Sequence, residues 1–257
     1  MADIQATTGL CCRNCGSDLH GQYCSACGQK HLDKRLDTVV LVSNAFAALT
    51  EVDSAIWRTV RECTCNAGQV ALNYIKGQRS RYVNPVKFFL TVFALYVALL
   101  AATGTLDRIA DGSVQFGEGT DMESAPAQAA LAFQGILRTH FNLIFFTTLP
   151  LFALMIRWQY WRAGRNYAET LSFLCFVVGI SCVYSSVFVV GLPLLDIYSN
   201  LPRAIILTIV FAIGTRTFFC LSWFKTVLGL LLSGLFYLLA TSVSGIGLTV
   251  LKLVGVF

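Results

Sequence analysis

The sequence predicts an all-α polytopic membrane protein with about five transmembrane helices and a small N-terminal zinc-ribbon head. Three observations predict this class. Long apolar runs dominate the chain after about Val86. Only 13% of the 257 residues are charged and 56% are hydrophobic, with a mean hydropathy of +0.65, whereas soluble domains are roughly a quarter charged. Two Cys-x-x-Cys-Gly motifs, Cys12–Gly16 and Cys24–Gly28, stand within the first thirty residues.

The thiols of the two motifs are predicted to bind one structural Zn²⁺ ion, which prefers tetrahedral sulfur coordination in such sites. Eight residues separate Cys15 from Cys24, enough for a short hairpin that brings the motifs together. A rubredoxin-type iron site and a redox dithiol are the alternatives, although a dithiol needs only one pair of cysteines. The predicted ligands are Cys12, Cys15, Cys24 and Cys27.

Four thiols complete the coordination of the ion, so the site is predicted to be closed and structural rather than catalytic. His20 and His31 are therefore interpreted as surface residues. Cys11 could replace Cys12 as a ligand, but its spacing is the less usual one. A head this small has no core of its own, so the metal is expected to fold it.

The chain divides into three parts by composition. Apolar residues at helical spacing, among them Leu49, Val52, Ile56 and Val60, predict amphipathic helices that lie in the membrane interface or pack on the body. Pro85 is expected in the first turn of a helix, where its missing N–H costs nothing. The parts are a zinc ribbon (1–31), cytosolic or interfacial linker helices (32–85) and a transmembrane domain (86–257), with spans at about 86–103, 139–156, 170–190, 202–221 and 226–250.

Two segments of the transmembrane part differ from the rest. The acidic, glycine-containing stretch 104–137 is interpreted as a solvent-exposed loop. The stretch Leu192–Arg203 contains Pro193, Asp196 and Pro202, which shorten the apolar run of the fourth span. A re-entrant segment is the alternative there.

Charge predicts the orientation. The first ten residues have neither a basic stretch nor an apolar stretch of a signal peptide, so the head is expected to stay on the side of synthesis. With five spans and the N-terminus inside, 15 of the 19 Lys and Arg residues lie inside. The expected location is the cytoplasmic (inner) membrane, with a cytosolic N-terminus and the C-terminus outside.

Basic residues next to the apolar runs account for the net charge of +5. Such residues flank membrane spans on the cytoplasmic side, so we expect contact with the lipid bilayer and no nucleic-acid partner. The residues assigned to the membrane interface are Lys76, Arg79, Arg81, Arg157, Arg162 and Arg165.

The sequence contains no catalytic constellation, such as a nucleophile elbow, a phosphate loop or a cluster of histidines within the spans. The ionisable residues in or next to the spans are Asp196, Arg203, Arg216 and Glu169, and we interpret Asp196 and Arg203 as a loop or interface pair. Cys63 and Cys65 form a CxC pair, for which burial, redox chemistry and acylation all stay open.

The arrangement resembles a bacterial family of uncharacterised membrane proteins that carry a short N-terminal ribbon with two CxxC motifs. The resemblance covers roughly the first hundred residues, and it implies the architecture and the zinc ribbon but no activity. Where the family tends to have Pro-Gly, this chain has Asn66-Ala67-Gly68. The matching residues are Cys12, Cys15, Gly16, Tyr23, Cys24, Cys27, Gly28, Gln29, Lys30, Tyr74, Gly77, Arg79, Tyr82 and Pro85.

Together these features favour a non-enzymatic membrane protein with an interaction or regulatory role. Its head is expected to dock a protein partner or to pack on its own body. The rival interpretation is a small channel or transporter assembled as a homo-oligomer. A lipid-modifying enzyme is a third, and it would need a polar cluster at the inner interface.

Overall fold

The computed structural model describes residues 11–19, 21–30, 38, 55–113, 124–194 and 201–253. His20, His31, Leu49, Val52 and Asp196, which carried expectations above, lie outside the described residues. The described elements are α2 (Ala55–Lys76), α3 (Pro85–Ala102), α4 (Thr105–Ser113), α5 (Ala125–Gln159), the short 3₁₀ helix η1 (Trp161–Ala163), α6 (Tyr167–Leu194), α7 (Leu201–Phe218) and α8 (Trp223–Leu253).

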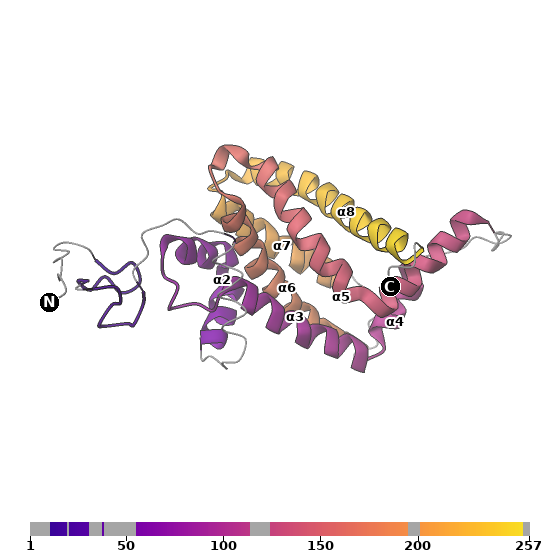
Figure 1. Cartoon of the computed structure of the whole chain (residues 1–257), viewed down its shortest axis with the longest axis horizontal. Coiled ribbons are helices and arrows are strands. Elements are labelled where there is room, and N and C mark those ends of the chain that lie inside the picture. The colour runs from indigo at the N-terminus through magenta and orange to yellow at the C-terminus, as the bar shows by residue number, and fades with distance from the viewer. Residues whose placement is uncertain are drawn as a thin grey trace.

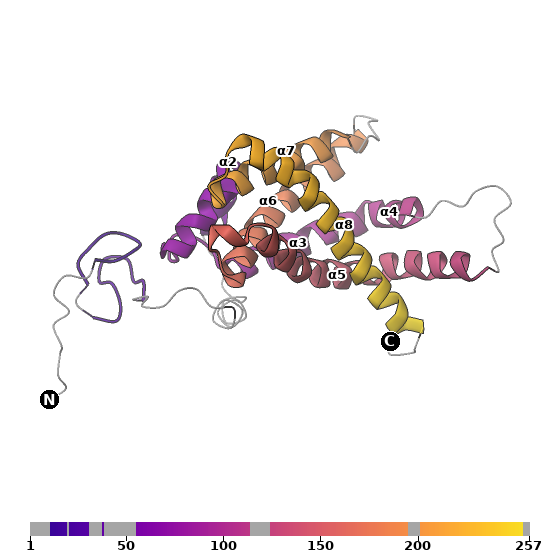
Figure 2. The same cartoon turned by 90° about the horizontal axis from the view of Figure 1, so that it is seen from above.

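The body is a bundle of helices, and the cysteine-containing head lies at one end of it, next to α2 (Figure 1). We call this the head end. From it α3, α6 and α8 lead away, while α5 and α7 return toward it (Figure 1, Figure 2). The all-α class with an N-terminal cysteine head is therefore confirmed for the described residues, whose head has two isolated β-bridges and no strand.

Four of the described helices are long and apolar enough to cross a membrane. A bilayer core about 30 Å thick needs roughly 20 helical residues. Much of the surface of these helices is apolar and exposed, as on α8 at Leu228, Leu231 and Leu235, which suits contact with lipid. The four segments are Pro85–Ala102, Ala130–Gln159, Tyr167–Gly191 and Trp223–Leu251.

The fourth span, expected at about 202–221, corresponds to α7. This helix is continuous over its 18 residues and returns from the far end of the bundle to the head end (Figure 1). Arg203 and Arg216 stand near its two ends. The guanidinium of Arg216 lies 4.5 Å from the centre of the Trp223 ring. A crossing by α7 remains a prediction, and so does the total of five spans.

The expectation of a solvent loop over 104–137 is wrong for much of its length. Residues Thr105–Ser113 form α4, and α5 begins already at Ala125. The two helices are joined by ion pairs, because Arg138 reaches both Asp107 and Asp111. The helix α4 has only nine residues, and glycine and acidic residues follow it in the chain, a composition that favours a loop over a helix.

Two caps fix the helices next to the head end. Pro85 occupies the first turn of α3, as expected, and the side chain of Asn84 accepts hydrogen bonds from the N–H groups of Val86 (2.9 Å) and Lys87. Within α2 the backbone leaves the helical range at Asn66. Its Oδ1 accepts from the N–H of Gln69 at 3.1 Å, so Asn66 caps the second half of the helix.

The packed core lies mainly among α2, α3 and α6. Phe88, Phe173 and Phe176 are fully buried, and Phe176 packs against Tyr74 of α2 with the ring centres 5.8 Å apart. Burial of these aromatic side chains holds α2 against the bundle. The hinge, which we define as residues 77–84 between α2 and α3, is therefore anchored to the core at both of its ends.

Candidate metal centre

The two motifs of the head form equivalent turns. In the first, the N–H of Gly16 bonds to the carbonyl of Cys12 at 2.8 Å, and in the second the N–H of Gly28 bonds to that of Cys24 at 2.8 Å. Both glycines have positive φ angles, 77° and 71°. An L side chain is strained in this conformation, which explains the glycine after each motif.

These turns bring the four predicted ligands together. The Sγ atoms of Cys12, Cys15, Cys24 and Cys27 all lie within 4.8 Å of one another. Cys12 and Cys27 are 3.6 Å apart and Cys15 and Cys24 are 3.5 Å apart, measured between Sγ atoms. A tetrahedron with Zn–S bonds of 2.3 Å has edges of about 3.8 Å. The cluster therefore has the size of a metal site, and its sulfur atoms are too far apart for disulfides.

Neighbouring polar groups favour the thiolate form of two of the four cysteines, Cys15 and Cys27, whereas the pKa of Cys24 is raised to about 11. The Ser17 hydroxyl lies 3.2 Å from Sγ of Cys15, and this contact lowers the pKa of Cys15 to about 6. A hydrogen bond from Asn14 lowers the pKa of Cys27. Cys11 is outside the cluster, and its thiol lies 3.9 Å from Asp18. The geometry thus selects Cys12 over Cys11.

The head is attached to the hinge through one buried side chain, Gln29. Its exposed fraction is 8%. Its Nε2 donates to the carbonyl of Gly77, and its Oε1 accepts from the backbone N–H groups of Arg79 and Ser80, both at 3.1 Å. The carbonyl of Gln29 accepts from the N–H of Cys24 at 2.9 Å. One residue therefore connects the second cysteine turn to the hinge.

The three basic residues at the hinge have different surroundings. Lys76 is exposed in the last turn of α2. Arg79 is partly buried, with its guanidinium 5.8 Å from the Tyr74 ring centre, and burial lowers its pKa from the usual value. Arg81 pairs with Glu62 at 2.7 Å. Two of the three are therefore held by protein groups, and their role at a membrane interface stays a prediction.

The other three predicted interface residues lie together where α5 ends at the same end of the bundle. Arg157 belongs to the last turn of α5. Arg162 lies 5.6 Å from the Trp161 ring centre, and Arg165 lies 5.2 Å from that of Phe218. The six basic residues thus stand on two stretches of the chain, the hinge with the end of α2, and the turn from α5 into α6.

Sequence reasoning missed a buried lysine. Lys87 in the first turn of α3 is 2% exposed, and Glu169 in the first turn of α6 is 4% exposed. The N–H of Glu169 donates to Oδ1 of Asn166 at 2.7 Å, and the N–H of Asn166 donates back to its carboxylate. A lysine three residues into an apolar span was the available signal.

The cysteines of the CxC pair lie on opposite sides of α2. Cys63 is buried, and burial raises the pKa of its thiol, whereas Cys65 is exposed. Two residues on a helix are about 200° apart, so these thiols cannot form a disulfide with each other while α2 is intact.

Comparison with known proteins adds one finding. Residues 53–97 match the model of a family described as proteins of unknown function (DUF3667). The matched segment contains α2, the hinge and most of α3, and it therefore includes the backbone groups to which Gln29 of the head is hydrogen-bonded. No curated protein and no solved structure matches the chain. The match and the cysteine cluster fit the expected architecture of an uncharacterised family with a CxxC-type head.

Proposed function

We propose that this protein is an integral membrane protein whose cytosolic zinc ribbon is a regulatory interaction module rather than a catalyst. The observation that carries the proposal is the Gln29 side chain, whose amide bonds three backbone groups of the hinge from within the metal head. The metal is Zn²⁺, bound by Cys12, Cys15, Cys24 and Cys27.

The four cysteine ligands form a closed set. Four thiolates leave no coordination position for a water or a substrate, as expected of a structural ion. The only buried hydrophobic cluster within the described head consists of Cys12, Leu19 and Cys24. A head with so small a core depends on its metal for folding. Loss of the ion, or oxidation of its thiols, would therefore release Gln29 from the hinge.

The hinge is well placed to pass this change on. It leads directly into α3, which is packed on α6 through Phe88 and Phe176. Release of the head would uncover the N–H groups of Arg79 and Ser80 and the head surface that covers them. We propose that a protein partner binds this uncovered surface. We also propose that the head lies in the reducing cytosol of a bacterial cell, at the inner membrane.

One experiment tests the proposed coupling of metal and hinge. Hydrogen exchange of the detergent-solubilised protein should show slow exchange at the amides of Arg79 and Ser80 when zinc is bound. A strong chelator, or Gln29→Ala, should speed exchange there. Gln78→Ala is the matched control, since the described structure gives that side chain no hydrogen bond. Equal exchange at these two amides with and without the metal would contradict the proposal.

A channel or transporter is the second candidate, favoured by the buried charges of Lys87 and Glu169 in neighbouring helices. Ionisable groups in membrane helices often line transport paths. The exposed apolar face of α8 would then serve the contact between copies in a homo-oligomer. Ion flux into proteoliposomes that disappears in Lys87→Met, with the protein still folded, would favour this candidate over the regulatory one.

A further inference from the structure

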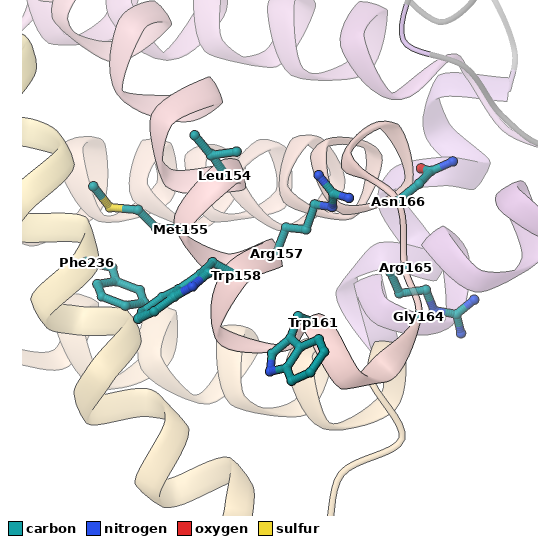
Figure 3. Close-up of a pocket in the computed structure, with 9 residues that line it drawn as sticks. All are labelled: Leu154, Met155, Arg157, Trp158, Trp161, Gly164, Arg165, Asn166 and Phe236. Carbon is teal, nitrogen blue, oxygen red and sulfur yellow. The ribbon is translucent and has the colours of Figure 1, made fainter.

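A cavity of about 840 Å³ opens at the head end, where α5 turns through η1 into α6 (Figure 3). One wall comes from the last turns of α5, another from the loop before α6, and a third from α8. Its lining includes Leu154, Arg157, Trp158, Trp161, Arg165 and Phe236.

One half of the cavity is apolar. Leu154 of α5 and Phe236 of α8 form its wall, and the Trp158 ring lies 5.9 Å from that of Phe236 between ring centres. Trp158 and Trp161 remain 70% and 68% exposed, as interfacial tryptophans of membrane proteins do. The apolar wall continues along α8 beyond Phe236 at Leu239 and Val243, which are exposed. A hydrocarbon chain can therefore follow α8 away from the cavity.

The other half of the cavity carries the positive charges of Arg157 and Arg165. The side chain of Arg157 extends from α5 toward the space between Leu154 and Asn166 (Figure 3). Among the described residues, no ion pair or hydrogen bond engages its guanidinium. Arg165 also lines the cavity, but its guanidinium stacks on Phe218 and donates to the carbonyl of Phe218 at 3.4 Å. Arg162 stacks on Trp161 and is outside the lining. The carboxylate of Glu169, three residues after Asn166 in the chain, is buried and accepts from the N–H of Asn166.

We propose that this cavity is a binding site for an anionic phospholipid. Arg157 binds the phosphate of the head group, because guanidinium and phosphate are complementary in charge and in hydrogen-bonding geometry. One acyl chain lies along the apolar wall of Leu154 and Phe236 and onto α8. A free phosphate ion would leave that wall uncovered, so the lipid is the occupant that satisfies both halves.

Native mass spectrometry of the detergent-solubilised protein tests the site. With phosphatidylglycerol added, the wild type should retain one lipid per chain more tightly than it retains phosphatidylcholine. Arg157→Gln should weaken retention about fivefold, the factor expected for one cation at a membrane surface. Arg162→Gln removes the same charge five residues away, outside the cavity lining, and should retain the lipid as the wild type does.

Three results would overturn the site. The first is equal retention by the wild type and both variants, including no retention by any of them. The second is equal retention of the two lipids by the wild type. The third is displacement of phosphatidylglycerol by inorganic phosphate, which would indicate an ion site in place of a lipid site. Arg157 is exposed, and unchanged thermal unfolding of Arg157→Gln would show that the variant is folded.

Discussion

Gly68 of α2 and Gly214 of α7 are packed backbone to backbone, so that a Cβ atom on Gly68 would overlap the carbonyl oxygen of Gly214. Next to this contact, Nδ2 of Asn66 donates to the hydroxyl of Thr217 at 2.9 Å. Small residues at helix contacts allow backbones to approach closely in membrane proteins. The approach attaches α2, and with it the hinge and the head, to the membrane bundle.

Gly68→Ala should therefore destabilise the protein, since neither backbone can move without separating α2 from α7. The expected loss is about 1–3 kcal/mol of unfolding free energy, typical of overpacking. Thermal unfolding in detergent measures it. Gly234→Ala in α8 is the control. A Cβ at this position would have no neighbour within 4 Å, and alanine is a better helix former than glycine. Equal midpoints for the two variants would argue against the close contact.

Zinc binding can be checked ligand by ligand. Protein purified without chelators should contain one zinc per chain by elemental analysis, and Cys12→Ser or Cys27→Ser should abolish this. The membrane body should stay inserted, because its core does not include the head. Cys11→Ser is the sharp control, since this neighbouring thiol lies outside the cluster and its loss should leave the zinc in place. A wild-type content below about half a zinc per chain would exclude the site.

Glu62 predicts a pH dependence of the contact between α2 and the hinge. Its carboxylate accepts from the Tyr82 hydroxyl at 2.6 Å and from Arg81 at 2.7 Å. Burial works to raise the pKa of Glu62, but these two hydrogen bonds outweigh it, and the pKa lies below its usual value. A lowered pKa means that the pair stabilises the fold above the ordinary value of about 4.3 and loses this effect as the pH falls through the folded-state value.

Glu62→Gln should thus cost about 1 kcal/mol or less at neutral pH, as expected for a partly exposed pair. The difference from the wild type should shrink on acidification to about pH 4 and below. Chemical unfolding at a series of pH values measures both effects. A difference that stays constant down to the lowest pH would show that the charge of Glu62 has no part in it.

Some features of the fold and of the metal site can be predicted from the sequence, and others cannot. The spacing of the motifs alone predicts the thiol cluster, because each turn is local and needs only its own glycine. The cluster consists of Cys12, Cys15, Cys24 and Cys27. The start of α3 at Pro85 was predictable for the same reason. The hydrogen bonds of Gln29 with the hinge and the contact of Gly68 with Gly214 join residues far apart in the chain. Such contacts depend on how the helices pack, and no local pattern encodes them.

Topology is the remaining prediction, and it depends on α7. If α7 crosses, five spans place the head inside and the end of α8 outside, in agreement with the cation distribution. Ser113→Cys at the end of α4 and Lys252→Cys near the end of α8 should then both react with a membrane-impermeant maleimide added to intact cells. The wild type is the control, because under this topology its exposed native thiols, such as Cys65 and Cys220, all face the cytosol.

A different labelling pattern would show which part of the five-span topology is wrong. If Ser113→Cys labels from outside and Lys252→Cys labels only after permeabilisation, α7 does not cross and Arg203 does not reach the outer side. Arg203 donates to the Tyr96 hydroxyl at 3.2 Å, well within the span of α3, so the charge would then lie against a cavity rather than at an interface. That pattern would favour the channel or transporter over the regulatory module, because a charged helix that enters the membrane without crossing it is expected to line a path for solute.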